Sequence, residues 1–272
     1  MLELTRRIAE AAEGGEPVLV AMVLEPGPRA QLRPGARLAI TRSGERLGSL
    51  GDPELDDLVA AEAPAMFAEH AVGTVYVAPV GLSWRTVPGA TSLYIEVVEP
   101  KPVLLVVGAG HIGRALAKLG NFLGFHVAVI DDREEFADPA VLPEADEVIC
   151  AEYGPALDAY PIGPATHVVL VTRGHKHDEE ALRHCVGRGA RYLGMIGSKR
   201  RTSTVLEHLL ADGFDPEELA KVRTPIGLDI GAETPEEIAV AIMAEIILVR
   251  RGGTGAPMYW RPAHLRQPVR TP

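Results

Sequence analysis

The clearest pattern in the chain is an alternation of short apolar runs with helical segments in its second half. Strands of a parallel sheet are buried on both faces, so they appear as nearly continuous apolar runs rather than alternating ones. Such an alternation of buried strands and helices predicts a doubly wound parallel sheet. We expect strands at residues 103–107, 126–130, 147–151, 166–172 and 191–196, and helices at residues 114–124, 177–187, 198–211 and 215–221.

The first half has a different pattern, with no convincing phosphate-binding loop. A loop with three prolines and two glycines occupies residues 25–35, and the Pro100-Lys101-Pro102 segment breaks any helix. We therefore predict a smaller α+β domain over residues 1–100, a Rossmann-like domain over residues 101–251 and an extended tail over residues 252–272, docked through Tyr259 and Trp260. In the first domain we expect helices at residues 2–12 and 52–70, strands at residues 18–24, 73–78 and 92–98, and a hairpin formed by residues 36–41 and 46–50.

The last helix carries a start signal of its own. Thr234 is a preferred cap, Pro235 suits the first helical position, and Glu237 lies three residues after the cap. This spacing is that of a capping box. We expect a helix from here to about Arg250.

Composition narrows the classes of function. The chain has 272 residues, a net charge of −10, 47% hydrophobic residues and two cysteines. The negative charge argues against a broad nucleic-acid or acidic-membrane surface, so an anion site must be a local cluster. Two cysteines without metal-ligand spacing favour a reducing compartment, and no segment has the length of a membrane span or the pattern of a signal peptide. We expect a cytoplasmic protein.

A glycine motif follows the first strand of the parallel sheet. Gly108, Gly110 and Gly113 have the G-x-G-x-x-G spacing, directly after an apolar run and before a helix. The three glycines suit a tight turn, the close approach of a pyrophosphate, and helix–strand packing. Asp131 lies about 20 residues further on, where a ribose hydroxyl needs an acceptor. A glycine-rich turn that binds no nucleotide remains the alternative.

Polar side chains gather at the predicted carboxyl ends of the strands, where open α/β sheets bind ligands. The most informative cluster is the 197–201 turn. Ser198 is a good cap, so Lys199 and Arg200 fall in the first helical turn, where cations oppose the helix dipole. A bound phosphate would reverse that cost, and a solvated basic helix start is the alternative. The candidate ligand-binding residues are Gly108, Gly110, His111, Gly113, Asp131, Arg133, His175, His177, Ser198, Lys199 and Arg200.

The histidine-rich segment after the fourth strand has two functional interpretations. His175 and His177 with Asp178 would either ligate a metal or line a polar ligand site, with a histidine as acid or base. His-x-His on an irregular turn supplies too few metal ligands, and Asp178 suits the cap of the next helix. We therefore expect a ligand-lining loop and no metal. Cys150 and Cys185 are expected to be inert, and no hydrolase or NTPase motif is present.

Five motifs together identify a family resemblance. They are GAGHIGRALAKL, VIDDREEFA, TRGHKHDEEAL, RYLGMIGSKRR and TPIGLDIGAETPEEIAVAIMAEI. Their order resembles that of xanthine dehydrogenase accessory proteins of the XdhC/CoxI type, and the likeness covers nearly all of the second half. In the first half, residues 32–38 and 48–50 are similar to the family's elements more loosely.

The resemblance implies a cytoplasmic factor that binds molybdenum cofactor, protects it during sulfuration, and delivers it to a molybdenum hydroxylase. Its implied partners are the hydroxylase apo-enzyme and a cysteine desulfurase, and a homodimer is compatible with the sequence. Family members commonly carry a cysteine after the Gly-Ser turn, whereas this chain has residues 51–55 without one, which leaves a thiol-dependent step there without a basis.

The residues also support a second function, an NAD(P)-dependent oxidoreductase. This hypothesis rests on the glycine motif and Asp131, and Arg133 would suit a 2′-phosphate of NADP. Molybdopterin and dinucleotides both present a phosphate and a fused heterocycle, so the sequence leaves the ligand open. Because the linker is short, we further expect the first domain to close over the crevice through the loop of residues 29–37.

Overall fold

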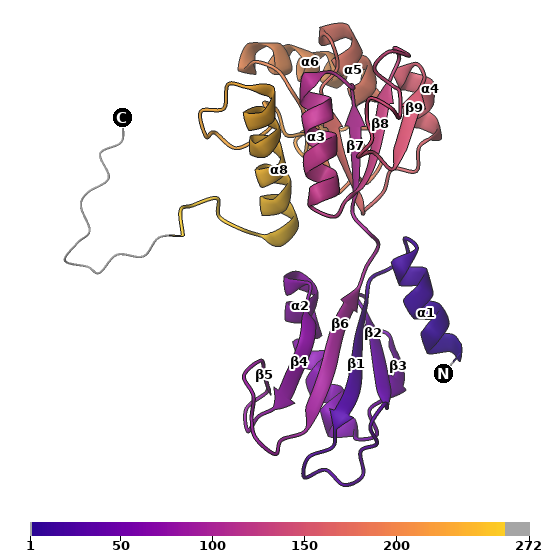
Figure 1. Cartoon of the computed structure of the whole chain (residues 1–272), viewed down its shortest axis with the longest axis vertical. Helices are drawn as coiled ribbons and strands as arrows, with labels where there is room; N and C mark the ends of the chain where they lie inside the picture. The colour runs from indigo at the N-terminus through magenta and orange to yellow at the C-terminus, as the bar shows by residue number, and fades with distance from the viewer. Residues whose placement is uncertain (1, 259–272) are drawn as a thin grey trace, which may run out of the picture.

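The computed structural model describes residues 2–258, except for the side chains of His175 and Lys176. Two sheets, one antiparallel and one parallel, form the frames of its two halves (Figure 1). This arrangement confirms the fold class, a Rossmann-like parallel sheet preceded by a smaller α+β unit. Tyr259 and Trp260, through which we expected the tail to dock, lie outside the described residues.

The antiparallel sheet has the strand order β3-β2-β1-β6-β4-β5. The hairpin predicted around Ser43 and Gly44 is confirmed, with Arg37 of β2 paired to Ser49 of β3. Helix α1 (Leu2–Ala12) packs on one face and α2 (Pro53–Glu69) on the other, each over its own apolar cluster. The strands are β1 (Val18–Glu25), β2 (Arg37–Thr41), β3 (Arg46–Ser49), β4 (Val72–Val77), β5 (Leu82–Ser83) and β6 (Ser92–Val98).

The parallel sheet has the strand order β11-β10-β7-β8-β9. Its first strand, β7, is central, and the order reverses beside it, which is the topological switch point where such sheets bind ligands. Every residue of β10 is buried, including the polar residues Thr166 and His167 at its start. The strands are β7 (Val103–Val107), β8 (His126–Asp131), β9 (Glu147–Cys150), β10 (Thr166–Leu170) and β11 (Tyr192–Met195).

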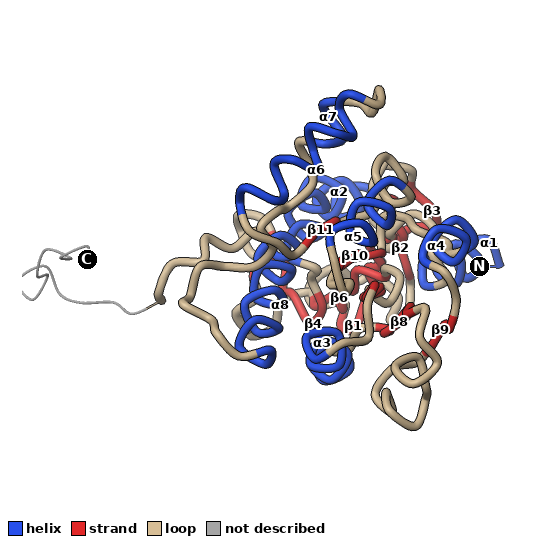
Figure 2. The backbone as a smooth tube through the Cα atoms, turned by 90° about the horizontal axis from the view of Figure 1, so that it is seen from above, coloured by secondary structure: helices blue, strands red, loops and turns tan. Residues whose placement is uncertain are grey.

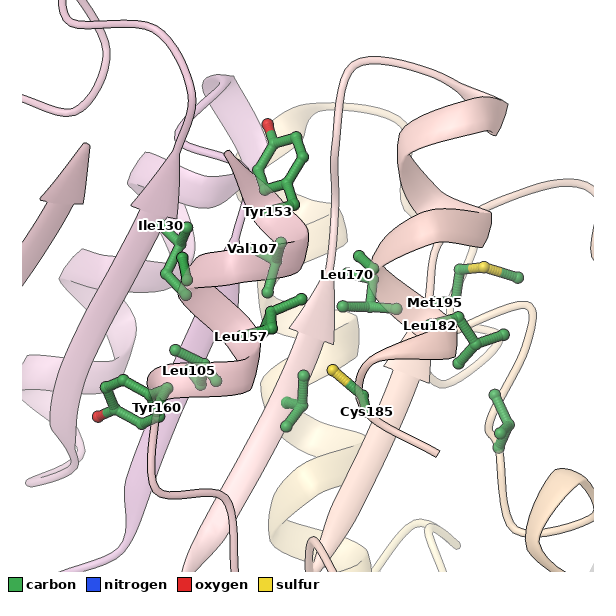
Figure 3. Packing of buried hydrophobic residues seen from close by; sticks show 14 of the residues in the cluster. Leu105, Val107, Ile130, Tyr153, Leu157, Tyr160, Leu170, Leu182, Cys185 and Met195 are labelled. Carbon is green, nitrogen blue, oxygen red and sulfur yellow. The ribbon is translucent and has the colours of Figure 1, made fainter. Parts of the chain in front are cut away.

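Helices cover both faces of the parallel sheet, as Figure 2 shows from above. On one face lie α3 (His111–Phe122) and α8 (Pro235–Arg251), packed over Leu104, Val106 and Val127. On the other lie α4 (Tyr153–Ala159), α5 (His175–Arg183) and α6 (Lys199–Ala211), over the cluster drawn in Figure 3. The short helix α7 (Pro216–Leu219) follows α6.

Local signals explain where the long helices begin. Thr234 and Glu237 form the predicted capping box at the start of α8, with Glu237 N donating to Thr234 Oγ1 at 3.2 Å. Asp52 caps α2 by accepting a hydrogen bond from the amide of Glu54 at 3.0 Å. Each cap satisfies amides that have no partner within the helix.

The first unit lies beyond the amino ends of the parallel strands (Figure 1). We call this end of the parallel sheet its amino edge and the opposite end its carboxyl edge. His70, which ends α2, makes a 3.4 Å contact from Nε2 to the carbonyl oxygen of Arg250 at the end of α8. Strand β1 begins beside Val98, next to the linker, and runs away from the parallel sheet. The loop of residues 29–37, which follows β1, therefore lies at the far end of its own unit.

The prediction that this loop closes over the crevice is wrong for the single chain. The short linker does hold the two units close together, but it joins them at the amino edge, because β7 begins where the linker ends. The carboxyl edge of the parallel sheet is left open by the first unit.

Within residues 2–258, no helix combines the length and the apolar character that a membrane span requires.

Candidate functional site

The glycine turn after β7 has three positions with different steric requirements. Gly108 has a φ of 111°, and a Cβ there would lie 2.5 Å from the carbonyl oxygen of Val171. A Cβ on Gly113 would lie far inside van der Waals contact with the carbonyl oxygen of Gly108. At Gly110, by contrast, nothing lies within 4 Å of an added Cβ. The turn is closed toward the protein and open at Gly110, as a site for close approach of a ligand requires.

Helix α3 begins immediately after this opening. Its first backbone hydrogen bond runs from the amide of Arg114 to the carbonyl oxygen of Gly110, at 2.9 Å. The preceding amides therefore face the crevice at the positive end of the helix dipole, which is the general arrangement of an anion site. His111, the first residue of α3, is exposed beside them.

Asp131, at the end of β8, is fully buried and bonded within the protein. Its Oδ2 accepts hydrogen bonds from the amide of Ala109 at 2.7 Å and from Arg133 Nη2 at 2.9 Å. Its Oδ1 accepts from the amide and Nε of Arg133, at 3.1 and 2.9 Å. Burial acts to raise the pKa of Asp131, but the hydrogen bonds from Arg133 and Ala109 outweigh it, so the pKa lies below the usual value.

These hydrogen bonds bear on the expected role of Asp131 as the acceptor of a ribose hydroxyl. A carboxylate has about four acceptor positions, and donors of the protein occupy all four on Asp131. The pair with Arg133 ties the end of β8 to the glycine turn through Ala109. A ribose hydroxyl would have to displace one of these donors to reach Asp131.

Asp132, the next residue, carries an unsatisfied oxygen. Its Oδ2 accepts a hydrogen bond from Arg173 at 2.5 Å, which links the turns after β8 and β10. Its Oδ1 is buried and has no hydrogen-bond partner among the described residues. Buried polar atoms are nearly always paired, so this oxygen is available to a donor from a ligand or a water.

Tyr153 was not among the candidate residues, because α4, the helix that begins with it, was not predicted from the sequence. Its ring stands above Val107 and Ile130 at the carboxyl ends of β7 and β8, with the hydroxyl pointing away from the apolar cluster (Figure 3). The hydroxyl is buried and, within the described part of the chain, has no hydrogen-bond partner. Burial, together with Asp131 and Asp132, raises the pKa of Tyr153.

The segment after β10 differs from its prediction. Helix α5 begins at His175 rather than at residue 177, and its cap is Gly174. The prediction that Asp178 caps this helix is wrong. The carboxylate instead accepts hydrogen bonds from Thr172 Oγ1 at 2.6 Å and from the amide of Thr172 at 3.2 Å, because the backbone at the end of β10 needs an acceptor. Burial raises the pKa of Asp178 to about 6.

His177 lies on the crevice side of α5. Its ring packs edge-on against Tyr153, with centroids 5.6 Å apart, and its Nδ1 is 3.8 Å from Glu180. The side chain of His175 is outside the described part, so its predicted role stays untested. Among the described residues, no group of three histidine, cysteine, aspartate or glutamate side chains is placed to hold a metal ion.

The basic turn after β11 begins α6, with Ser198 at the cap position. The Ser198 side chain makes no capping hydrogen bond, and Lys199 and Arg200 are exposed. Strand β11 is two positions from β7, about 10 Å at the usual strand spacing. The first turns of α3 and α6 thus face the same edge of the sheet from opposite faces (Figure 2).

The two cysteines differ in burial. Cys185 is buried in the apolar cluster, which raises the pKa of its thiol to about 12. Cys150 is exposed at the end of β9. In the first unit, within residues 51–55, where the family cysteine is missing, Asp52 caps α2 and pairs with Arg29 and Gln31. Asp52 has a structural role there.

Two family models match the chain. The model described as the XdhC Rossmann domain matches residues 104–246, and the model described as the XdhC and CoxI family matches residues 11–77. The first match begins in β7 and ends in α8, so it contains every turn of the candidate site and the parallel sheet except for Val103.

Curated relatives are similar over part of the chain. "Uncharacterized protein YqeB" of Escherichia coli K12 is 36% identical over 177 residues, covering 65% of this chain and 32% of that protein. A probable xanthine dehydrogenase subunit of Bacillus subtilis 168 is 35% identical over 161 residues, covering 59% of this chain and 47% of that protein. The alignments thus cover less than half the length of either relative.

A crystal structure described as a xanthine dehydrogenase from Bacillus halodurans has a similar fold. The TM-score is 0.53 at 21% sequence identity, covering 93% of this chain and 96% of that one. At this identity the likeness concerns the fold alone.

Proposed function

Because the chain belongs to the XdhC and CoxI family, we propose that its parallel sheet binds molybdenum cofactor and that the chain delivers it to a xanthine dehydrogenase-type molybdenum hydroxylase. The observation that carries the proposal is the opening at Gly110, directly before the first turn of α3. An anionic phosphate fits there, against backbone amides and the positive end of the helix dipole.

The other groups of the crevice suit the rest of such a ligand. Lys199 and Arg200 supply cationic donors from the opposite side of the sheet. The Tyr153 hydroxyl and Asp132 Oδ1 supply a buried hydroxyl and a buried acceptor that lack hydrogen-bond partners among the described residues, although Arg133 Nε lies 4.0 Å from Asp132 Oδ1. A pterin edge presents the complementary donors and acceptors, so these residues would hold and orient it. When bound, the group supplies the metal chemistry of the client enzyme.

The proposed partners follow from the same role. They are the hydroxylase apo-enzyme that receives the cofactor and a cysteine desulfurase that supplies its sulfur. For the chain itself we propose binding, protection and transfer rather than catalysis.

The competing hypothesis is an NAD(P)-dependent oxidoreductase. It needs Asp131 to accept a ribose hydroxyl or Arg133 to receive a 2′-phosphate. Both side chains are bonded to each other, with two hydrogen bonds of 2.9 Å. A dinucleotide would have to break this pair, so the geometry favours the first proposal.

The test is to identify what the purified chain binds. Mass spectrometry of the co-purified small molecules and calorimetric titration with molybdopterin, NAD and NADP separate the two hypotheses. The double variant K199A/R200A is expected to weaken binding of the preferred ligand by roughly 2–4 kcal/mol, since two charge-assisted hydrogen bonds are lost.

The matched control is K118A/R251A, which removes two exposed cations of the same half from α3 and α8. It should leave the affinity unchanged. Nicotinamide in the purified protein, or tight NAD binding without molybdopterin binding, would replace the proposal with the oxidoreductase. A fall in melting temperature of K199A/R200A at unchanged affinity would show that the basic turn is a structural element.

A further inference from the structure

A cavity lies between the two units, at the opposite edge of the parallel sheet from the glycine turn. It has a volume of about 410 Å³ and adjoins a second hollow of about 380 Å³. Both are lined by Arg42 of the first unit, His70 at the end of α2, and Arg191 before β11. Volumes of this size suit a small organic ligand.

The charges around this cavity are unbalanced. Within the described residues, Arg42 and Arg191 have no carboxylate partner within 4 Å. The two carboxylates that line the cavity are already engaged. Glu99 Oε1 is 2.6 Å from His70 Nδ1 and 3.7 Å from Arg250 Nη2, while Glu16 pairs with Arg7 at 3.4 Å and accepts a hydrogen bond from the amide of Ser43 at 2.7 Å. Two exposed guanidinium groups without a carboxylate, one from each unit, therefore line the same space, where an anion would neutralise them.

A buried histidine at the cavity wall has one unpaired ring nitrogen within the described residues. The Nδ1 of His167 is 3.2 Å from the carbonyl oxygen of Val103, while its Nε2 is buried and unpaired within the described part. Burial lowers the pKa of His167 to about 4, and the charges of Arg250 and Arg191 add to this effect. The same cations lower the proton affinity of the imidazole and raise the affinity for an anion.

The backbone at His70 is a further outlier. His70 has a φ of 49°, and no other non-glycine residue in the described part has a positive φ. This conformation costs free energy for a side chain that has a Cβ, and it directs the chain into the contact with Glu99 and Arg250. The strain lies at the junction of the two hollows.

We propose that this interdomain cavity binds a small planar organic anion, separate from the ligand of the glycine turn. Arg42 and Arg191 hold the anionic group. The planar body lies against apolar residues of the two hollows, which are Phe67 and Pro64 in one and Pro100 and Pro164 in the other. The inference does not depend on the function proposed for the carboxyl edge.

The experiment titrates the full chain with three probes by calorimetry. Phenyl phosphate carries both a ring and a dianion, inorganic phosphate carries the anion alone, and phenol carries the ring alone. We expect phenyl phosphate to bind more tightly than inorganic phosphate, and phenol not to bind. The variant R42A/R191A should lower the affinity for phenyl phosphate by about tenfold or more, because charge-assisted hydrogen bonds are lost.

Two further variants locate the effect. R33A/R85A removes two exposed arginines of the first unit away from the cavity and should bind phenyl phosphate as the parent does. K199A/R200A removes the cations of the carboxyl edge, where a phosphate also fits, and should retain the binding that R42A/R191A loses. In NMR spectra, the ring signals of His70 and His167 should shift during the titration.

The proposal is overturned by any of three results. These are no binding of phenyl phosphate at millimolar concentration, equal affinity of R42A/R191A and the parent chain, and loss of binding in K199A/R200A. The last result would assign the probe to the glycine-turn site. Failure of molybdopterin to bind would not affect the outcome, so the two proposals are tested separately.

Discussion

Replacing Asp131 by asparagine tests whether this residue is a structural acceptor or a ligand contact. The substitution keeps the shape of the side chain and removes its charge. Only one of the two oxygens remains, so two of the four hydrogen bonds are lost, and the new amide group faces a donor of Arg133 or Ala109. Breaking a buried charge pair costs about 3–5 kcal/mol. Because the Arg133 side chain is 21% exposed and keeps some hydration, we expect the low end, about 3 kcal/mol.

The pH dependence gives an independent readout. The pKa of Asp131 is lower in the folded chain than its usual value of 3.8. The carboxylate therefore stabilises the fold fully above that value, and the stabilisation is lost as the pH falls through the folded pKa. The difference between the parent chain and D131N should be full at pH 7 and should narrow below about pH 4.

The assay is calorimetric unfolding, following the transition of the second unit. The control is E135Q, which removes an exposed carboxylate from the same turn and should change stability by less than about 0.5 kcal/mol. If D131N unfolds with the parent's free energy at pH 7, the four hydrogen bonds do not hold the turn. Asp131 would then be free for a ribose, and the dinucleotide hypothesis would gain.

The other predictions concern the same edge of the sheet. G113A should destabilise the second unit severely, because its Cβ meets the carbonyl oxygen of Gly108. G110A should keep the parent's melting temperature and lose ligand affinity. Equal effects of the two variants on stability would contradict the steric argument. Y153F should leave stability unchanged or raised and lower the affinity for molybdopterin, because the hydroxyl has no partner among the described residues; unaltered affinity would exclude it as a ligand contact. D178N should stabilise the fold at pH 8 but not at pH 4. The carboxyl group of Asp178 has a pKa raised to about 6, so it opposes folding as the pH rises from its usual pKa to 6. Urea titrations at both pH values measure the difference in stability.

Much of the fold could be predicted because local signals and tertiary structure agree. The runs that became β7, β8 and β10 are buried on both faces, which is why they contain no polar alternation. The Thr234–Glu237 box and the hairpin turn at Ser43 and Gly44 depend on neighbouring residues alone. The family resemblance of the second half could also be found from the sequence, because long contiguous motifs carry it.

The parts that could not be predicted depend on contacts between distant residues. Asp178 is a good cap by its type, but its side chain turns back to Thr172, and no local pattern indicates that choice. The side chain of Tyr153 becomes relevant only because β9 lies beside β8, which places α4 near the glycine turn. The loop of residues 29–37 was assigned to the wrong side because a short linker fixes how close two units lie, but not at which edge they meet.

The attachment of the first unit at the amino edge has a consequence for how a ligand enters and leaves the crevice. No part of residues 2–98 roofs the turns that follow β7, β8 and β10 (Figure 1). A cargo held there can be reached by a second macromolecule without any hinge opening first. Under the proposed function, transfer of the cofactor depends on how the receiving protein docks. The receiving protein itself covers the open side of the crevice, and water is displaced only when the cofactor and the receiving protein are both in place.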